Sequence, residues 1–149
     1  MILLDEMPRT LQAENEVRAI YAACHPGWPD RRRSWYFAHP TLVAEEDGHR
    51  IVAHASFTLN PTTATLYLMD TCVLPSYRGQ GIARRLMVER EAHGRALGAK
   101  IFVGCTWAEN VAIIKIHDAL GYHACQRVPG YFKHNDPPAD GIIYIKAEG

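Results

Sequence analysis

The sequence predicts an α/β fold of the α+β type, and three features of the chain support this prediction. Apolar runs typical of strands alternate with segments of helical periodicity, in the order strand, two helices, three antiparallel strands, helix, strand, helix and two strands. An Asp-Gly step at residues 47–48 lies between two apolar runs, which is typical of a β-hairpin. After residue 64, strands and helices alternate, which predicts a right-handed crossover and locally parallel pairing.

The N-terminal half is expected to contain a strand, two helices and a hairpin. The first helix begins after Thr10, a plausible N-cap, and the second ends before Pro40. The predicted ranges are strand 2–4, helix 10–23, a helix within 31–39, and strands 41–46 and 51–59 around a turn at 47–50.

The C-terminal half is expected to contain a long strand followed by two helices and three further strands. The first of these helices buries Ala83, Leu86 and Met87 on one face, and the second is stopped by Gly121. The predicted ranges are strand 64–73, a helix from about 81 to 98, strand 100–107, helix 111–120, strands 122–128 and 141–147, and a loop with three prolines at 129–140.

Length and charge limit the partners of the chain. With 149 residues, of which 48% are apolar and 21% charged, the chain is predicted to form one domain over residues 1–149. Lys plus Arg and Asp plus Glu number 16 each, so the net charge is zero and nucleic acid is not expected as a partner, even with the basic run Arg31–Arg33. The start MILLDEMPRT does not resemble a signal peptide, and no apolar run could span a membrane, so we expect a cytoplasmic protein without a membrane partner.

The cysteine and histidine spacings predict no metal site. The four cysteines, Cys24, Cys72, Cys105 and Cys125, include no CxxC pair, and the eight histidines show no ligand spacing. We therefore expect reduced thiols, with Cys72 and Cys105 packed in the sheet.

The stretch Arg78-Gly79-Gln80-Gly81-Ile82-Ala83 lies where an apolar strand meets a helix. A helix N-terminus carries unpaired backbone N–H groups, and glycines ahead of it let the backbone approach an anion closely. The stretch therefore suits a phosphate or pyrophosphate cradle, with a tight turn that binds nothing as the alternative. A dinucleotide fingerprint is excluded because Arg84 stands at its third glycine, and the Walker pattern is absent.

The same stretch resembles the acyl-CoA loop of the GNAT superfamily, the acetyl-CoA-dependent N-acetyltransferases. In that pattern Arg or Gln is followed, after two residues, by Gly, any residue, and Gly or Ala, and Arg78, Gly81 and Ala83 satisfy it. The preceding TLYLMDTCVLPS resembles the family's fourth strand and its V-x-P step. The resemblance covers the chain from about Val43 onward and implies the GNAT fold, with a mixed central sheet of about six to seven strands flanked by about four helices.

A second segment resembles the family's other motif, a helix written roughly N-x-x-A-x-x-x-Y-x-x-x-G-F, and PGYFKHNDPPADGIIYIK is similar to its Tyr-rich turn and last strand. The matching residues of the helix motif are Asn110, Ile116, His117, Leu120, Gly121 and Tyr122, with Tyr122 in place of Phe. The resemblance implies acetyl-CoA as co-substrate and no metal. The implied cofactor-binding residues are Arg78, Gly79, Gln80, Gly81, Ile82 and Ala83 for the pyrophosphate, the backbone of Cys72 and Val73 with Asn110 for the pantetheine arm, and His117 near the sulfur.

The catalytic side chains depart from the family pattern. His117 stands where the family's Tyr protonates the leaving thiolate, and its helical position predicts that it points inward, so a catalytic and a structural role are both open. The family carries a glutamate on its fourth strand or on its fifth, and neither glutamate is present here. Met69 stands at the first of these positions, and the second lies near Cys105. Asp70 could bind the ammonium or accept its proton through water, or instead pair with an arginine; His54 and Glu109 are weaker candidates for the base.

The acceptor is expected to be a primary amine, on a small molecule, a polyamine or a protein, acetylated directly in a ternary complex. Asp70, Tyr36 and Tyr131 are the residues predicted to bind it. A catalytically silent acyl-CoA-binding sensor or interaction module is the alternative. Many members of the family are dimers, so a homodimer is compatible with the resemblance, although no segment of the sequence identifies an interface.

Overall fold

The computed structural model describes residues 1–30, 35 and 39–148. Most of the predicted second helix, the basic run Arg31–Arg33 and the predicted acceptor-binding residue Tyr36 lie outside the described residues.

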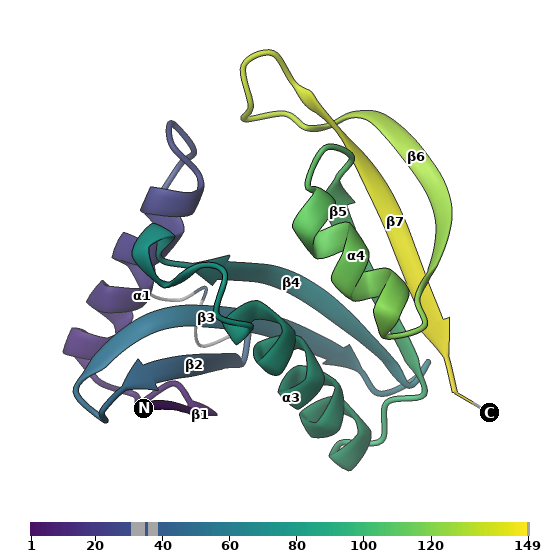
Figure 1. Cartoon of the computed structure of the whole chain (residues 1–149). Helices are drawn as coiled ribbons and strands as arrows, with labels where there is room; N and C mark the ends of the chain where they lie inside the picture. The colour runs from purple at the N-terminus through teal and green to yellow at the C-terminus, as the bar shows by residue number, and fades with distance from the viewer. Residues whose placement is uncertain (31–34, 36–38, 149) are drawn as a thin grey trace. The chain divides into compact units, whose positions relative to one another are not determined.

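The described chain is a mixed α+β protein, which confirms the predicted fold class (Figure 1). Its seven strands are β1 (Ile2–Glu6), β2 (Thr41–Glu46), β3 (Arg50–Asn60), β4 (Thr65–Val73), β5 (Ile101–Trp107), β6 (His123–Phe132) and β7 (Ala139–Ala147), in the sheet order β1-β2-β3-β4-β5-β7-β6. Its α-helices are α1 (Leu11–Cys24), α3 (Ile82–Ala96) and α4 (Val111–Ala119), three where the resemblance implied about four.

The chain divides into two compact units, and the boundaries between them fall within β3, β4 and α3. The first unit comprises Met1–Thr58 and Met69–His93, and the second comprises Leu59–Leu68 and Gly94–Gly149. In the part of the chain that the structure describes, no helix is both long enough and apolar enough to cross a membrane.

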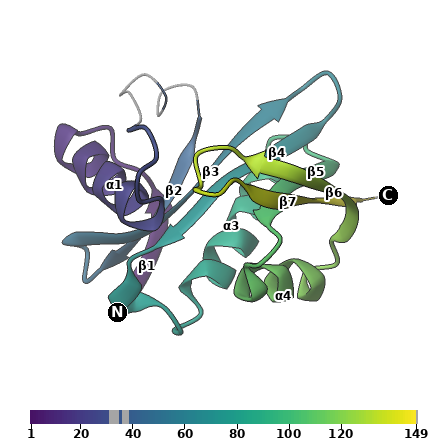
Figure 2. The ribbon, with the colours of Figure 1, turned by 90° about the horizontal axis from the view of Figure 1, so that it is seen from above.

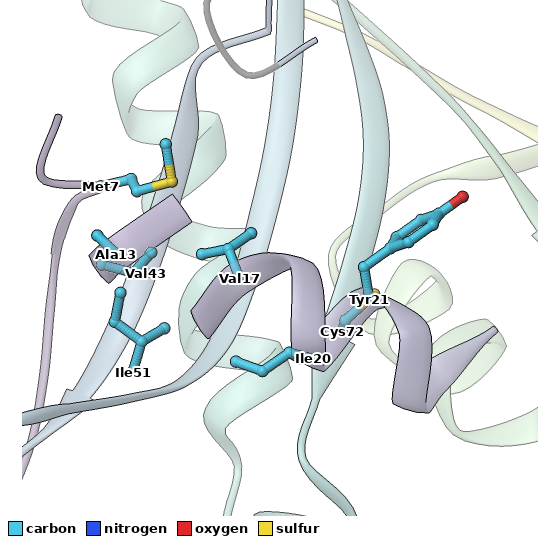
Figure 3. Close-up of a cluster of buried hydrophobic side chains, with 8 residues drawn as sticks. All are labelled: Met7, Ala13, Val17, Ile20, Tyr21, Val43, Ile51 and Cys72. Atoms are coloured by element: carbon cyan, nitrogen blue, oxygen red, sulfur yellow. The ribbon is translucent and has the colours of Figure 1, made fainter. Parts of the chain in front are cut away.

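In the first unit, β1, β2 and β3 pair antiparallel, and the predicted hairpin turn forms at Asp47 and Gly48, whose φ angles are 50° and 72°. Thr10 caps α1 by accepting a hydrogen bond from the Ala13 N–H. Helix α1 packs on one sheet face through a buried cluster (Figure 3), and α3 lies along the other face (Figures 1 and 2). The cluster consists of Met7, Ala13, Val17, Ile20, Tyr21, Val43, Ile51 and Cys72.

In the second unit, Thr65–Leu68 pair in parallel with Ile101–Gly104, as the strand–helix–strand pattern predicts. Strand β7 pairs antiparallel with both β5 and β6, and α4 lies against one face of these strands (Figure 2).

The hairpin of β6 and β7 is longer than the sequence predicts. The proline-rich loop was expected at 129–140, but β6 continues to Phe132, which pairs with Ala139. The ladder is irregular between Val128 and Phe132, where Pro129 has no N–H to donate. The Pro-Gly step therefore produces a bulge within the strand instead of ending it.

Candidate functional site

The loop between β4 and α3 has the geometry that suits an anion cradle. A 3-10 turn at Pro75–Tyr77 leads into Gly79 and Gly81, whose φ angles are +80° and +78°. Side chains with a Cβ are strained at such angles, so the backbone conformation itself requires glycine at both positions. Both glycines are exposed, and apart from the glycine and its two chain neighbours no described residue has an atom within 4 Å of a Cβ built on either one. The backbone at the start of α3 is thus accessible to a ligand.

Arg78 ties this loop to the end of β4 and to α1. Its Nε donates a hydrogen bond of 3.1 Å to the Val73 carbonyl, and its Nη2 lies 3.6 Å from the Cys24 sulfur. The guanidinium therefore faces groups of its own unit, and it fixes where the loop begins.

Asp70 lies in the second half of β4, and its carboxylate faces two side chains. Its Oδ2 lies 3.2 Å from Nδ1 of His54 in β3 and accepts a hydrogen bond of 3.8 Å from the Cys72 thiol. The His54 ring is fully buried, and the Asp70 side chain is 8% exposed. Among the described residues, a histidine and a cysteine contact the Asp70 side chain, and the pairing with an arginine that the sequence left open stays a prediction.

Those three residues also form a cluster that the sequence analysis missed. The candidate ligand atoms of His54, Asp70 and Cys72 lie within 4.8 Å of one another, and among the described residues this is a group with the donor types of a metal site. Spacing along the sequence gave no signal, because two strands bring the residues together.

Arg90 is a second residue that the sequence analysis did not identify. It is 2% exposed in α3, and its Nη1 donates hydrogen bonds of 3.2 and 3.1 Å to the carbonyls of Ser56 and Asp70. A buried guanidinium needs such acceptors, so Arg90 fixes the backbone of β4 at Asp70. The available signal was its helical spacing from Leu86 and Met87, which puts it on the apolar face.

His117 points inward from α4, as its helical position predicts, and it is 4% exposed. Its ring stacks on Tyr144 of β7 at 4.6 Å with an interplanar angle of 6°, and it meets Tyr122 edge-on at 5.0 Å. The ring lies in the last turn of α4, where a positive charge is favoured by the helix dipole.

A hydrogen bond fixes the tautomer of His117. Its Nδ1 lies 3.1 Å from the Ile113 carbonyl oxygen, which can only accept, so Nδ1 carries a proton. In the neutral ring Nε2 is then an acceptor, and Nε2 becomes a donor only in the imidazolium. This narrows the catalytic role that the sequence left open for His117, because Nε2 can donate a proton only from the imidazolium.

Asn110 caps α4: its Oδ1 accepts a hydrogen bond of 3.3 Å from the Ile113 N–H. This bond occupies the side-chain oxygen and leaves the amide NH₂ as the donor group for any pantetheine contact. The predicted pantetheine contact stays a prediction.

Tyr131 lies in β6, with 47% of its surface exposed. Its hydroxyl contacts the Cys105 thiol of β5, and burial raises the pKa of both groups, so both are protonated at neutral pH.

The predicted site residues are divided between the two units. The first unit contains Asp70, Cys72, Val73 and the loop Arg78–Ala83, and the second contains Asn110, His117 and Tyr131.

Comparison with known sequences gives a family match over most of the chain. The model described as "Acetyltransferase (GNAT) family" matches residues 10–122. The L-methionine sulfoximine/L-methionine sulfone acetyltransferase of Salmonella typhimurium is 29% identical over 108 residues, which are 67% of this chain and 63% of that protein. An aminoglycoside N(6')-acetyltransferase type 1 of Acinetobacter genomosp. 13 is 34% identical over 73 residues, which are 49% of this chain and 50% of that protein. The chain thus spans less than two thirds of either relative.

Solved structures resemble nearly the whole chain. The yncA protein of Salmonella typhimurium, solved with its cofactor acetyl-CoA, has a TM-score of 0.80 at 22% identity, over 100% of this chain and 95% of that one. The ribosomal-protein-S18-alanine N-acetyltransferase of Escherichia coli has a TM-score of 0.80 at 17% identity, over 99% and 94%. At these identities the likeness concerns the fold, and it confirms the predicted fold.

Proposed function

Because the chain belongs to the acetyltransferase (GNAT) family, we propose that it transfers an acetyl group from acetyl-CoA to a primary amine. The observation that carries the proposal is the exposed loop Arg78–Ala83, in which two glycines at positive φ precede the N-terminus of α3. Such a loop offers backbone N–H groups and the positive end of a helix dipole to a pyrophosphate. The yncA structure, which holds acetyl-CoA on a similar fold, supports that choice of co-substrate.

The proposed reaction is direct attack of the amine on the thioester carbonyl. A C–N bond forms, the C–S bond breaks, CoA leaves as a thiolate, and the amine nitrogen loses a proton. Backbone N–H groups near Cys72 and Val73 would stabilise the negative oxygen that develops on the carbonyl.

We assign to His117 the protonation of the leaving thiolate. Since Nδ1 donates to Ile113, the proton must come from Nε2, so the imidazolium is the active form. The neutral ring has no Nε2 proton to give, so the step requires the charged ring. Tyr144 and Tyr122 hold the ring in place.

For the proton of the incoming ammonium we propose Asp70, acting through water. Its side chain is 8% exposed, which allows a water to reach it but leaves little room for direct contact with a bulky amine. His54 and the Cys72 thiol orient the carboxylate from the buried side.

A small-molecule amine is the acceptor class that the relatives support. The names of the two compared relatives specify methionine sulfoximine or methionine sulfone and aminoglycosides, which are small molecules. Asp70 and Tyr131 are the predicted acceptor contacts that lie within the described residues.

The first test is thermal unfolding with and without excess acetyl-CoA, with ATP and NAD as controls. A ligand at a hundred times its Kd adds about 2.7 kcal/mol to the free energy of unfolding. For a chain of this size that corresponds to an increase in Tm of about 5–10 °C. The absence of a shift specific to acetyl-CoA would refute the proposed loop function.

The second test is CoA release with a panel of small primary amines, read by a thiol reagent that detects CoA. Turnover with at least one amine is expected. Tight acetyl-CoA binding with no turnover would instead support the silent binding module.

A further inference from the structure

Three metal-ligating side chains converge between the neighbouring strands β3 and β4, within the first unit. His54 comes from β3, whereas Asp70 and Cys72 alternate along β4 and so lie on the same face of it. Cys72 also belongs to the buried cluster beneath α1 (Figure 3). Two strands that pair with each other thus bring a nitrogen, an oxygen and a sulfur donor to one place.

The separations of the donor atoms match those of a tetrahedral metal centre. The Asp70 Oδ2 lies 3.2 Å from Nδ1 of His54 and 3.8 Å from the Cys72 sulfur, and the candidate ligand atoms of all three lie within 4.8 Å of one another. With Zn–N and Zn–O bonds of about 2.0–2.2 Å and Zn–S bonds of about 2.3 Å, neighbouring ligand atoms of a tetrahedron are about 3.3–3.7 Å apart. Small movements of these side chains would therefore complete the site.

The His54 ring is a second and independent indication of a ligand. It is fully buried, and neither of its nitrogens has a hydrogen-bond partner among the described residues. The Asp70 oxygen is close to Nδ1 but out of line for a hydrogen bond with it, so the contact does not satisfy the nitrogen. In a metal centre the nitrogen lone pair points at the metal and not at the neighbouring ligand, which is the relation that this contact has.

The charges of the three donors balance that of a divalent ion. A carboxylate and a thiolate carry one negative charge each and an imidazole carries none, so a centre with Zn²⁺ is neutral, as burial favours. The Cys72 thiol now donates to Asp70 Oδ2, and zinc would replace that proton between the sulfur and the oxygen. Imidazole, thiolate and carboxylate are all ligands that zinc accepts.

We propose that His54, Asp70 and Cys72 bind one Zn²⁺ ion, with the fourth tetrahedral position open to water. Three protein ligands and one open position form a known type of zinc site. The Asp70 side chain is 8% exposed and gives the ion access to solvent, whereas His54 and Cys72 are buried behind it. The inference does not depend on the proposed acetyl transfer.

A bound zinc ion has one consequence for the proposed reaction. Asp70 cannot accept the proton of an ammonium while the same carboxylate oxygen ligates a metal. The role proposed for Asp70 therefore belongs to the metal-free chain. The experiments that test the zinc site measure binding and ligation, so their results do not depend on whether the chain catalyses acetyl transfer.

The test strips the whole purified chain with a chelator and then titrates it with Zn²⁺ in competition with a chromophoric zinc indicator. We expect one zinc ion per chain, and His54→Ala, Asp70→Asn and Cys72→Ser should each raise the Kd by more than the factor of about 10–100 that a supporting residue contributes. Cys105→Ser and His93→Gln are the matched controls, because they remove the same donor types outside the cluster, and both should bind zinc as the wild type does. Absence of stoichiometric zinc binding, or binding that all three cluster variants retain, would overturn the inference.

Spectroscopy of the wild-type chain keeps the inference testable if the cluster variants do not fold. Co²⁺ in place of zinc should give the visible absorption bands of a four-coordinate centre and a near-ultraviolet band from thiolate-to-cobalt charge transfer. X-ray absorption of the zinc-loaded chain should show sulfur at about 2.3 Å together with nitrogen or oxygen at about 2.0–2.2 Å. A zinc ion surrounded by nitrogen and oxygen alone would show that other residues bind it, and the proposed site would be wrong.

Discussion

The loop Arg78–Ala83 and the helix α4 place their candidate groups by opposite means. In the loop, Gly79 and Gly81 are exposed, and their positive φ angles create the feature, because the groups offered to a ligand are backbone N–H groups. In α4 the candidate group is the His117 side chain, which is 4% exposed and held by two tyrosines and by a carbonyl of its own helix. The loop therefore depends on local conformation, and the histidine depends on packing.

This difference predicts which substitutions each region tolerates. At Gly81 an added Cβ meets no described atom, so the cost is backbone strain alone. At Gly104 of β5, beside His117, a Cβ would lie 3.3 Å from the Leu68 Cβ and 3.8 Å from His117 Nε2, so the cost is steric. The two regions can thus be perturbed separately, by strain in one and by crowding in the other.

The largest expected effect is the loss of kcat when the His117 side chain is replaced. His117→Phe keeps an aromatic ring for the stack with Tyr144 but removes the Nε2 proton, so kcat should fall by about 100-fold or more, as for loss of a general acid. Steady-state CoA release at saturating acetyl-CoA measures this.

The melting temperature of His117→Phe serves as the control for packing. A variant that folds normally and keeps full kcat would show that His117 only packs. Helix α4 would then contribute packing and no catalytic side chain.

The next effect is on acetyl-CoA affinity. Gly81→Ala places a residue with a Cβ at φ +78°, and the free loop can relieve the resulting strain of about 1–2 kcal/mol by leaving this conformation, so that binding must restore it. We expect the Kd for acetyl-CoA to rise about tenfold, since 1.4 kcal/mol is a factor of ten. Isothermal titration calorimetry measures this Kd.

Gly98→Ala is the matched control for strain. Gly98 has φ +98° and open space around it, but it follows α3 instead of preceding it. This substitution should lower Tm without weakening the binding of acetyl-CoA. Equal affinities for Gly81→Ala and the wild type would contradict the role of the loop backbone.

A smaller effect is expected from crowding in the second unit. In Gly141→Ala the new Cβ would meet the Cys105 sulfur at 2.7 Å and Tyr131 at 3.1 Å, and overpacking of this kind costs about 1–3 kcal/mol. Tm should fall by about 3–10 °C in a thermal melt. Adding Cys105→Ala should restore part of the loss, and a double variant no more stable than Gly141→Ala would rule out this contact as the cause.

The sequence predicts the loop more fully than the surroundings of His117, because local patterns of residue types can be read from a sequence and tertiary contacts cannot. The loop was predictable because its chemistry lies in residue types at fixed spacing, and the hairpin turn at Asp47 was predictable likewise. The inward direction of His117 followed from helical periodicity, but its stack on Tyr144 did not, since that contact joins α4 to a strand 27 residues later. His54 beside Asp70 and Cys24 beside Cys72 are also tertiary contacts with no local signal.

The smallest change is expected at Cys24, and it tests the inward contacts of the loop. The pKa of Cys24 is about 6 because Cys72 and Arg78 stabilise the thiolate, so alkylation of Cys24 should be half-maximal near pH 6. Arg78→Gln removes the cation and should move this midpoint toward the ordinary thiol value of 9.0, and Cys72→Ala should move it further, because the Cys72 hydrogen bond is the larger cause. The rate of iodoacetamide labelling against pH measures the midpoint. If neither substitution moves it, Arg78 does not act on Cys24, and the loop's connection to α1 is confined to its bond with the Val73 carbonyl.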